Sequence, residues 1–171
     1  MITNILKQIS ELAIKAGDTD YSSEQIESNW LGTHPARIDE IEFAEEKLGI
    51  KLPKDYIDFL LITNGFTATN NCTEPRFEIV ENIEYLAKID DFIIEVWNQN
   101  GLEDIGKELA RSILIGGIEE EQYFLLIPPE SINDQWKYWK FASWIPGEYP
   151  FQNLQDYFSH VLDIMKRRML R

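Results

Sequence analysis

Hydrophobic residues recur at helical spacing in three long stretches of the chain. Ile2–Ala16 carries apolar residues every three or four positions, and Gly17 follows it as a residue suited to ending a helix. Ile38–Leu48 has the same spacing with acidic residues between, and Gly49 follows it. Residues 154–165 also keep one apolar face. The pattern therefore predicts three amphipathic helices, the first of them within 1–17.

A fourth helix is expected to begin at Pro53, because the fixed φ of proline suits a first helical turn. Its residues as far as Thr63 are apolar almost all round, so this helix should be buried on more than one side. Asn64 and Gly65 are expected to end it in a left-handed conformation. The two neighbouring helices make 38–65 the stretch around which the chain is organised.

Shorter runs of β-branched, aromatic and aliphatic residues predict strands. Segments 112–115 and 123–127 flank a pair of glycines and a run of glutamates, which indicates a hairpin around a solvated loop. Further strands are expected over 136–141 and, as a short one, over 77–80. Residues 145–150 contain two prolines and a glycine after Ile145 and are expected to form a turn.

The remaining segments are expected to be connections. Residues 18–32 should form a polar loop in which Trp30 and Leu31 pack back onto the core. Residues 67–74 are rich in threonine and asparagine and should form an exposed connection.

Residues 81–100 mix apolar and acidic positions and are expected to be mostly helical, as are residues 103–110. With 171 residues, of which 44% are hydrophobic, the chain is long enough for one sizeable core and short for two. We therefore expect a single domain over 1–171.

The composition is strongly acidic, with 30 Asp and Glu against 16 Lys and Arg and a formal net charge of -14. Binding a nucleic-acid backbone requires a basic face, so we expect no nucleic-acid partner. An acidic surface attracts basic partners, although many cytosolic proteins are simply acidic.

The cysteine content and the N-terminal pattern favour the cytoplasm. Cys72 is the only cysteine, so a disulfide within the chain is excluded and a reducing compartment is expected. The N-terminal stretch interrupts its apolar residues with polar ones, unlike a signal peptide. Since no stretch approaches the roughly 20 apolar residues of a membrane span, we expect no membrane association.

The residue types favour a protein that is not an enzyme and holds no cofactor or metal. A zinc site needs three or four suitable ligands, whereas His34 and His160 are better explained as surface or boundary residues. Cys72 has no basic neighbours that would activate it as a nucleophile. Adjacent acids such as Asp90 and Asp91 are better explained by solvation than by catalysis.

Aromatic residues are concentrated in and after the strand predicted over 136–141. Alternate side chains of a strand point to opposite faces, so these rings cannot all enter one core. Some of them are candidates for a contact surface, and the alternative is a core with a second covered layer. The candidate partner-binding residues are Glu119, Glu120, Glu121, Trp136, Trp139 and Trp144.

The helix pair carries a longer pattern, formed by Ile41, Ala44, Glu45, Leu48, Gly49, Leu52, Pro53, Asp55, Tyr56, Phe59, Leu60, Asn64 and Gly65. This pattern resembles the signature of the SUKH superfamily, which includes the fungal Smi and Knr cell-wall regulators and many bacterial immunity proteins. The likeness extends over 30–165. It departs from the family in an acidic insertion around 81–101 and in the N-terminal helix.

The resemblance implies an α+β fold with a central mixed or antiparallel sheet flanked by helices, and it brings no catalytic residues. For a bacterial member it implies an immunity protein that neutralises a cognate toxin by direct binding. An acidic, aromatic surface would suit the basic cleft of a nuclease toxin. The alternative is a regulatory or scaffolding module that binds endogenous proteins. Both a monomer and a homodimer remain open.

Overall fold

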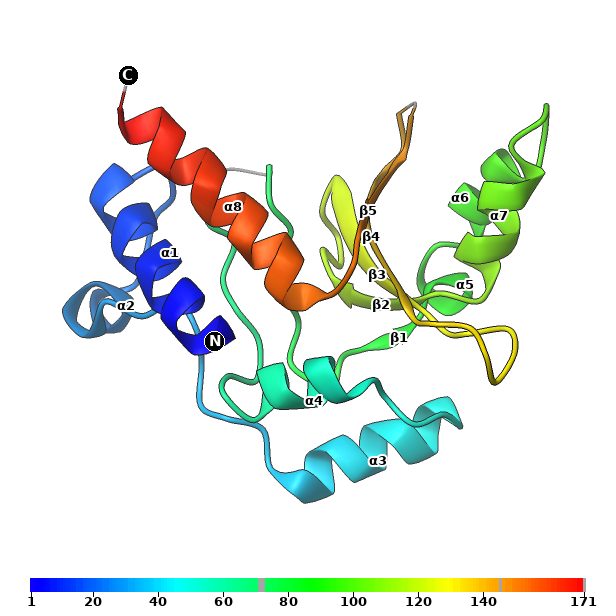
Figure 1. The fold of residues 1–171 in the computed structure, drawn as a ribbon, viewed down its shortest axis with the longest axis horizontal. Helices are drawn as coiled ribbons and strands as arrows, with labels where there is room; N and C mark the ends of the chain where they lie inside the picture. Colours follow the sequence, from blue (N-terminus) through cyan, green and yellow to red (C-terminus); the bar gives the residue numbers. More distant parts are fainter. Residues whose placement is uncertain (71–72, 145, 171) are drawn as a thin grey trace.

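The computed structural model describes residues 1–70, 73–144 and 146–170, which form a five-stranded sheet with helices on both faces (Figure 1). The strands lie in the order β1-β2-β3-β4-β5, and each neighbouring pair is antiparallel. The α+β fold is therefore confirmed, and of the two expected sheet types the antiparallel one is observed.

The strands are β1 (Glu84–Tyr85), β2 (Ile113–Gly116), β3 (Gln122–Ile127), β4 (Lys137–Ala142) and β5 (Glu148–Phe151). The helices are α1 (Ile2–Ala16), α2 (Ser23–Ser28), α3 (Ile38–Leu48), α4 (Lys54–Leu60), α5 (Leu86–Ile89), α6 (Asp91–Trp97), α7 (Glu103–Ala110) and α8 (Leu154–Met169).

Helices α1, α3, α7 and α8 and strands β2, β3 and β4 lie where the hydrophobic pattern predicts them. Gly17 and Gly49 end α1 and α3 with φ angles of 67° and 68°. This left-handed conformation favours glycine, because a Cβ would crowd the backbone. At the start of α8, the Asn153 side chain accepts the Asp156 N–H at 2.9 Å. Local signals therefore set the ends of these helices.

The structure corrects the predicted end of α4, which stops at Leu60. Asn64 and Gly65 consequently do not cap this helix. Thr63 is buried beyond the helix, and its Oγ1 accepts the N–H of Thr33 at 2.8 Å. The helix ends early because the residues after it bind a segment that is distant in the sequence.

The loop expected over 18–32 contains the short helix α2. Ser22 and Gln25 form a capping box, with the Gln25 N–H donating to Ser22 Oγ at 3.2 Å and the Ser22 N–H donating to Gln25 Oε1 at 3.0 Å. Leu31 is buried and Trp30 packs against the core, as predicted.

The described part of 67–74 is not the exposed connection that its composition suggested. Asn70 and Glu74 are buried, with 7% and 6% of their surfaces exposed. Glu74 accepts hydrogen bonds from the Tyr157 hydroxyl at 2.8 Å and from Lys140 Nζ at 3.0 Å. These partners satisfy the carboxylate, which is why a polar segment can cross the interior.

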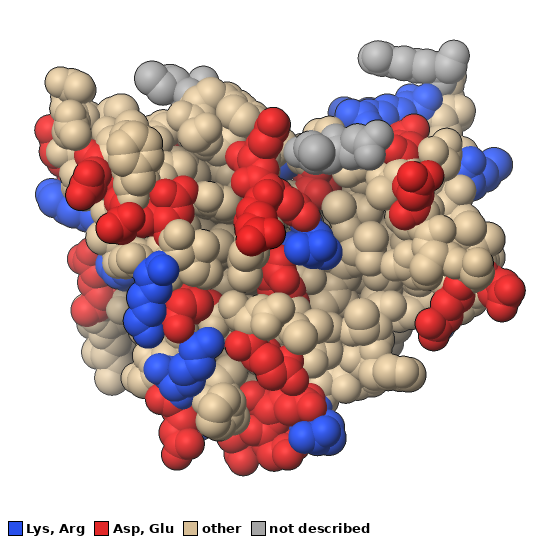
Figure 2. Space-filling view, turned by 180° about the vertical axis from the view of Figure 1, so that it is seen from behind, with Lys and Arg blue, Asp and Glu red and all other residues tan. Residues whose placement is uncertain are grey.

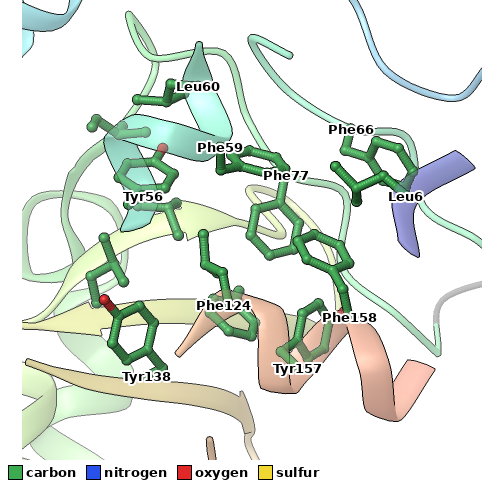
Figure 3. Close-up of a cluster of buried hydrophobic side chains, with 14 of the residues drawn as sticks. Leu6, Tyr56, Phe59, Leu60, Phe66, Phe77, Phe124, Tyr138, Tyr157 and Phe158 are labelled. Carbon is green, nitrogen blue, oxygen red and sulfur yellow. The ribbon is translucent and has the colours of Figure 1, made fainter. Parts of the chain in front are cut away.

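Residues 77–80 do not form the predicted strand. Phe77 makes only isolated bridges, to Phe66 and Gly116. Its ring lies at the centre of an aromatic cluster, with ring centroids at 5.0–5.7 Å (Figure 3). The neighbouring rings are Phe59, Phe124, Tyr157 and Phe158.

Two further segments differ from expectation. Residues 81–100 hold strand β1 before the short helices α5 and α6, which are separated at Asp90. The turn predicted over 145–150 is shorter, because strand β5 begins within it. Ile145 and Cys72 lie outside the described residues.

Both faces of the sheet are buried. Phe124 and Leu126 of β3 point into a first core formed with α1, α3, α4 and α8. Leu125 and Ile127 point the other way, into a second core formed with α5, α6 and α7. The alternation of strand side chains thus divides the hydrophobic residues of the sheet between two cores, one on each face. The loops lie at the ends of the strands.

Leu60→Ala should lower the free energy of unfolding by about 2–5 kcal/mol, because Leu60 is fully buried in the first core. The neighbouring Leu61→Ala should lower it by less than about 1 kcal/mol, because Leu61 is 41% exposed. Urea denaturation of both variants measures the difference. Equal losses would contradict this placement of the core.

Candidate protein-binding surface

The glutamates predicted to contact a partner lie in the loop between β2 and β3. Glu119 adopts a left-handed conformation with φ of 63°, and both Glu119 and Glu121 are exposed. Glu120 is partly buried and its Oε2 accepts the backbone N–H of Arg76 at 3.0 Å. The Gly117 N–H donates to the Arg76 carbonyl at 2.8 Å. The loop is therefore held at both ends against a neighbouring segment.

Trp144 lies close to this loop, in the connection from β4 to β5, and is 52% exposed. It borders a hollow of about 350 Å³ in the protein surface. The residues lining this hollow are Asp90, Ile93, Glu120, Glu121, Tyr123, Ser143 and Trp144. We call it the acidic hollow, since it brings an exposed tryptophan together with three carboxylates.

Sequence reasoning did not assign Asp90, Ile93 or Tyr123 to this surface. Asp90 Oδ1 accepts the Ile93 N–H at 3.1 Å and thereby caps α6, and its Oδ2 accepts the Tyr123 hydroxyl at 2.7 Å. Burial and the hydrogen bond to Asp90 raise the pKa of Tyr123 to about 12. Aspartate is a common N-cap residue, but residues 81–100 were expected to be mostly helical with no break at Asp90, and the pairing of Asp90 with β3 had no sequence signal.

The other two candidate tryptophans lie elsewhere. Trp139 is 8% exposed and packs in the second core, so it does not belong to the acidic hollow. Trp136 is half-buried against the first core, at the far end of β4 and beside Pro53 and Lys54 of the helix pair. Of the six candidates, the structure brings Glu120, Glu121 and Trp144 into one hollow.

The family-motif residues of the helix pair hold the fold together. Glu45 is 7% exposed, and its Oε1 accepts the Leu52 N–H at 2.9 Å while its Oε2 pairs with Lys51. This carboxylate fixes the elbow between α3 and α4. Asn64 Oδ1 accepts the Val80 N–H at 2.7 Å and joins the helix pair to the following segment.

Within the described ranges, no group of three or more His, Cys, Asp or Glu residues is placed to hold a metal ion. His34 is exposed, and the ring of His160 packs on Tyr149 at a centroid distance of 5.3 Å. None of the helices, over the residues described, has the length and apolar character needed to cross a membrane.

Acidic side chains gather on one face of the molecule in a central band and at the lower edge, where α3 lies (Figure 2). Over the described residues, Glu119 and Glu121 form no ion pair, whereas Asp39 of α3 pairs with Arg37 at 3.0 Å. Burial raises the pKa of Glu120 above its ordinary value of 4.5, although the Arg76 N–H opposes this shift. The loop therefore carries carboxylates with few compensating cations.

Glu120→Gln should reduce the dependence of stability on pH above 4.5. Because the pKa of Glu120 is raised in the folded state, its contribution to stability is present at low pH and is lost as pH rises through the folded pKa. Glutamine cannot titrate and keeps an acceptor for the Arg76 N–H. Thermal melts between acidic and neutral pH should therefore show a flatter profile for the variant. At neutral pH the variant should have a higher melting temperature than the unaltered protein.

Glu121→Gln removes one charge from an exposed position of the same loop and serves as the control. An unchanged pH profile in Glu120→Gln would contradict the assigned effect of burial.

Residues 35–163 match the model of the SMI1 / KNR4 family (SUKH-1). The match covers well over half of the chain and includes the helix pair, the whole sheet and most of α8. No curated protein matches the chain at a significant level. Because the family model covers this much of the sequence, the chain belongs to the SMI1 / KNR4 family (SUKH-1).

Proposed function

We propose that this protein is an immunity protein that binds a basic bacterial toxin, such as a nuclease, and blocks it. The observation that carries the proposal is the acidic hollow, in which Trp144 is exposed beside Glu120 and Glu121. The partner would be a protein with a basic surface. This function requires binding alone, in keeping with a family that is generally non-catalytic.

The chemistry of the acidic hollow suits such a partner in two ways. Carboxylates that form no ion pair with the described residues attract a basic surface over a distance and accelerate encounter, particularly at low salt. An exposed tryptophan at the centre of a contact supplies binding energy once water is excluded, and tryptophan is enriched among the residues that dominate interfaces. Charge would thus guide association, and Trp144 would slow dissociation.

A regulatory or scaffolding role is the second candidate. The match to the SMI1 / KNR4 family is compatible with this role as well as with the immunity function. In that case the partners would be endogenous proteins, and no toxin would be involved. The two functions differ in whether the protein protects a cell from a toxin encoded beside its own gene.

Co-expression with such a neighbouring toxin should restore growth, and raised salt should weaken binding of the purified pair. The double variant Trp144→Ala/Glu121→Lys should bind more than about tenfold less tightly, because it removes an aromatic anchor and reverses a charge. Calorimetry measures the affinities.

Glu27→Lys, which reverses an exposed charge on α2, is the matched control and should bind within about twofold of the unaltered protein. Failure of the unaltered protein to restore growth would overturn the immunity function. An equal loss of affinity in the control would show that the acidic hollow is not part of the interface.

A further inference from the structure

Helix α6 is apolar around most of its circumference but is covered on only part of it. Of its seven residues, Asp91 and Glu95 are acidic and the others are apolar. Ile93 and Trp97 are buried in the second core. Phe92, by contrast, is 70% exposed. A helix that is hydrophobic over most of its surface is normally buried on several sides, but the residues that the structure describes leave the outer side of α6 uncovered.

Phe92 and Val96 lie four positions apart and therefore occupy one face of α6, which we call the α6 face. Val96 is 44% exposed, and Ile89, just before the helix, is 38% exposed. The neighbouring helix α7 is different, because its exposed residues are mostly charged or small and include Glu103, Asp104, Lys107 and Ala110. The exposed residues of α7 are thus of the types expected in contact with water. The exposed apolar residues of α6 are not.

The acidic hollow lies beside the N-terminal end of α6. Ile93, next to Phe92, lines the hollow, and Asp90 caps the helix there. Trp97 packs so closely on Gly147 that a Cβ at Gly147 would lie 2.3 Å from the indole ring. Gly147, in the connection between β4 and β5, is therefore packed directly on α6.

The charges around the α6 face identify the occupant that suits it. Asp91 and Glu95 each precede a residue of this face, and neither forms an ion pair with any residue that the structure describes. A second copy of the chain placed on this face would bring these acids against their own counterparts, which is unfavourable. A partner with basic residues beside apolar ones would pair with the acids and cover the apolar side chains.

We propose that the α6 face selects the partner, by binding an apolar ridge flanked by lysine or arginine on the same basic protein that contacts the acidic hollow. The proposal rests on the proposed function for the identity of that protein, but the binding chemistry stands on α6 alone. Helix α3 is a poorer fit, because its exposed Ile38 and Phe43 lie five positions apart and point about 140° from one another.

The test uses a synthetic amphipathic peptide with leucines at helical spacing and lysines elsewhere, and a matched peptide with glutamates in place of the lysines. The chain should bind the lysine peptide and not the glutamate peptide. Phe92→Ser/Val96→Ser should weaken binding by about tenfold or more, because it removes the apolar contacts. Ile38→Ser/Phe43→Ser on α3 is the matched control and should change affinity by less than about twofold.

Three outcomes would overturn the inference: equal binding of both peptides, unchanged affinity of the α6 variant, or a loss confined to the α3 variant. Sedimentation is measured in parallel, since a dimer dispersed by the α6 substitutions would assign the face to a second copy. Thermal melts show whether each variant is folded.

The same variants in the co-expression assay separate this inference from the proposed function. If the unaltered protein and the α6 variant protect equally well, partner selection by α6 is wrong and the immunity function stands. If the unaltered protein does not protect, the immunity function fails and the peptide measurements decide the binding chemistry of α6.

Discussion

Burial of β3 on both faces is the constraint on which the arrangement depends. Phe124, Leu125, Leu126 and Ile127 are each fully buried, so neither side of the strand meets water over these four residues. Antiparallel sheets commonly leave one face solvated. Here the helices α5, α6 and α7 must cover the second face, and the surfaces free for a partner are the loops at the sheet ends and the outer sides of the helices.

Local signals made much of this fold predictable. Glycines at helix ends and the apolar periodicity located α1, α3 and α8, and the hairpin of β2 and β3 followed from two apolar runs around a polar loop. Strand β5 was missed because Pro146 and Gly147 just before it and Pro150 within it indicated a turn. Pro150 is tolerated in β5 because this strand lies at the edge of the sheet, where a missing N–H breaks no inner ladder.

The largest errors in predicting the interior come from contacts between residues that are distant in the sequence. Glu74 lies in a polar segment that reads as exposed, yet Lys140 and Tyr157, far along the chain, satisfy its carboxylate. The candidate surface shows the same limit. Alternation places Trp139 on one sheet face, but only the positions of α6 and α7 reveal that this face is covered. Trp144 escapes this burial because it lies beyond the strand.

The buried carboxylates also determine where negative charge is left uncompensated. A carboxylate can be buried only if hydrogen bonds or a cation stabilise it, and Glu45, Glu74 and Glu78 are paired with Lys51, Lys140 and Arg76 respectively. Each of these pairs commits one of only 16 Lys and Arg residues to the fold. Over the residues that the structure describes, the outward acids Glu119 and Glu121 of the β2–β3 loop and Asp91 and Glu95 of α6 form no ion pair. The same distribution of charge therefore has two effects. It stabilises the buried carboxylates, and it leaves the proposed binding surface negative.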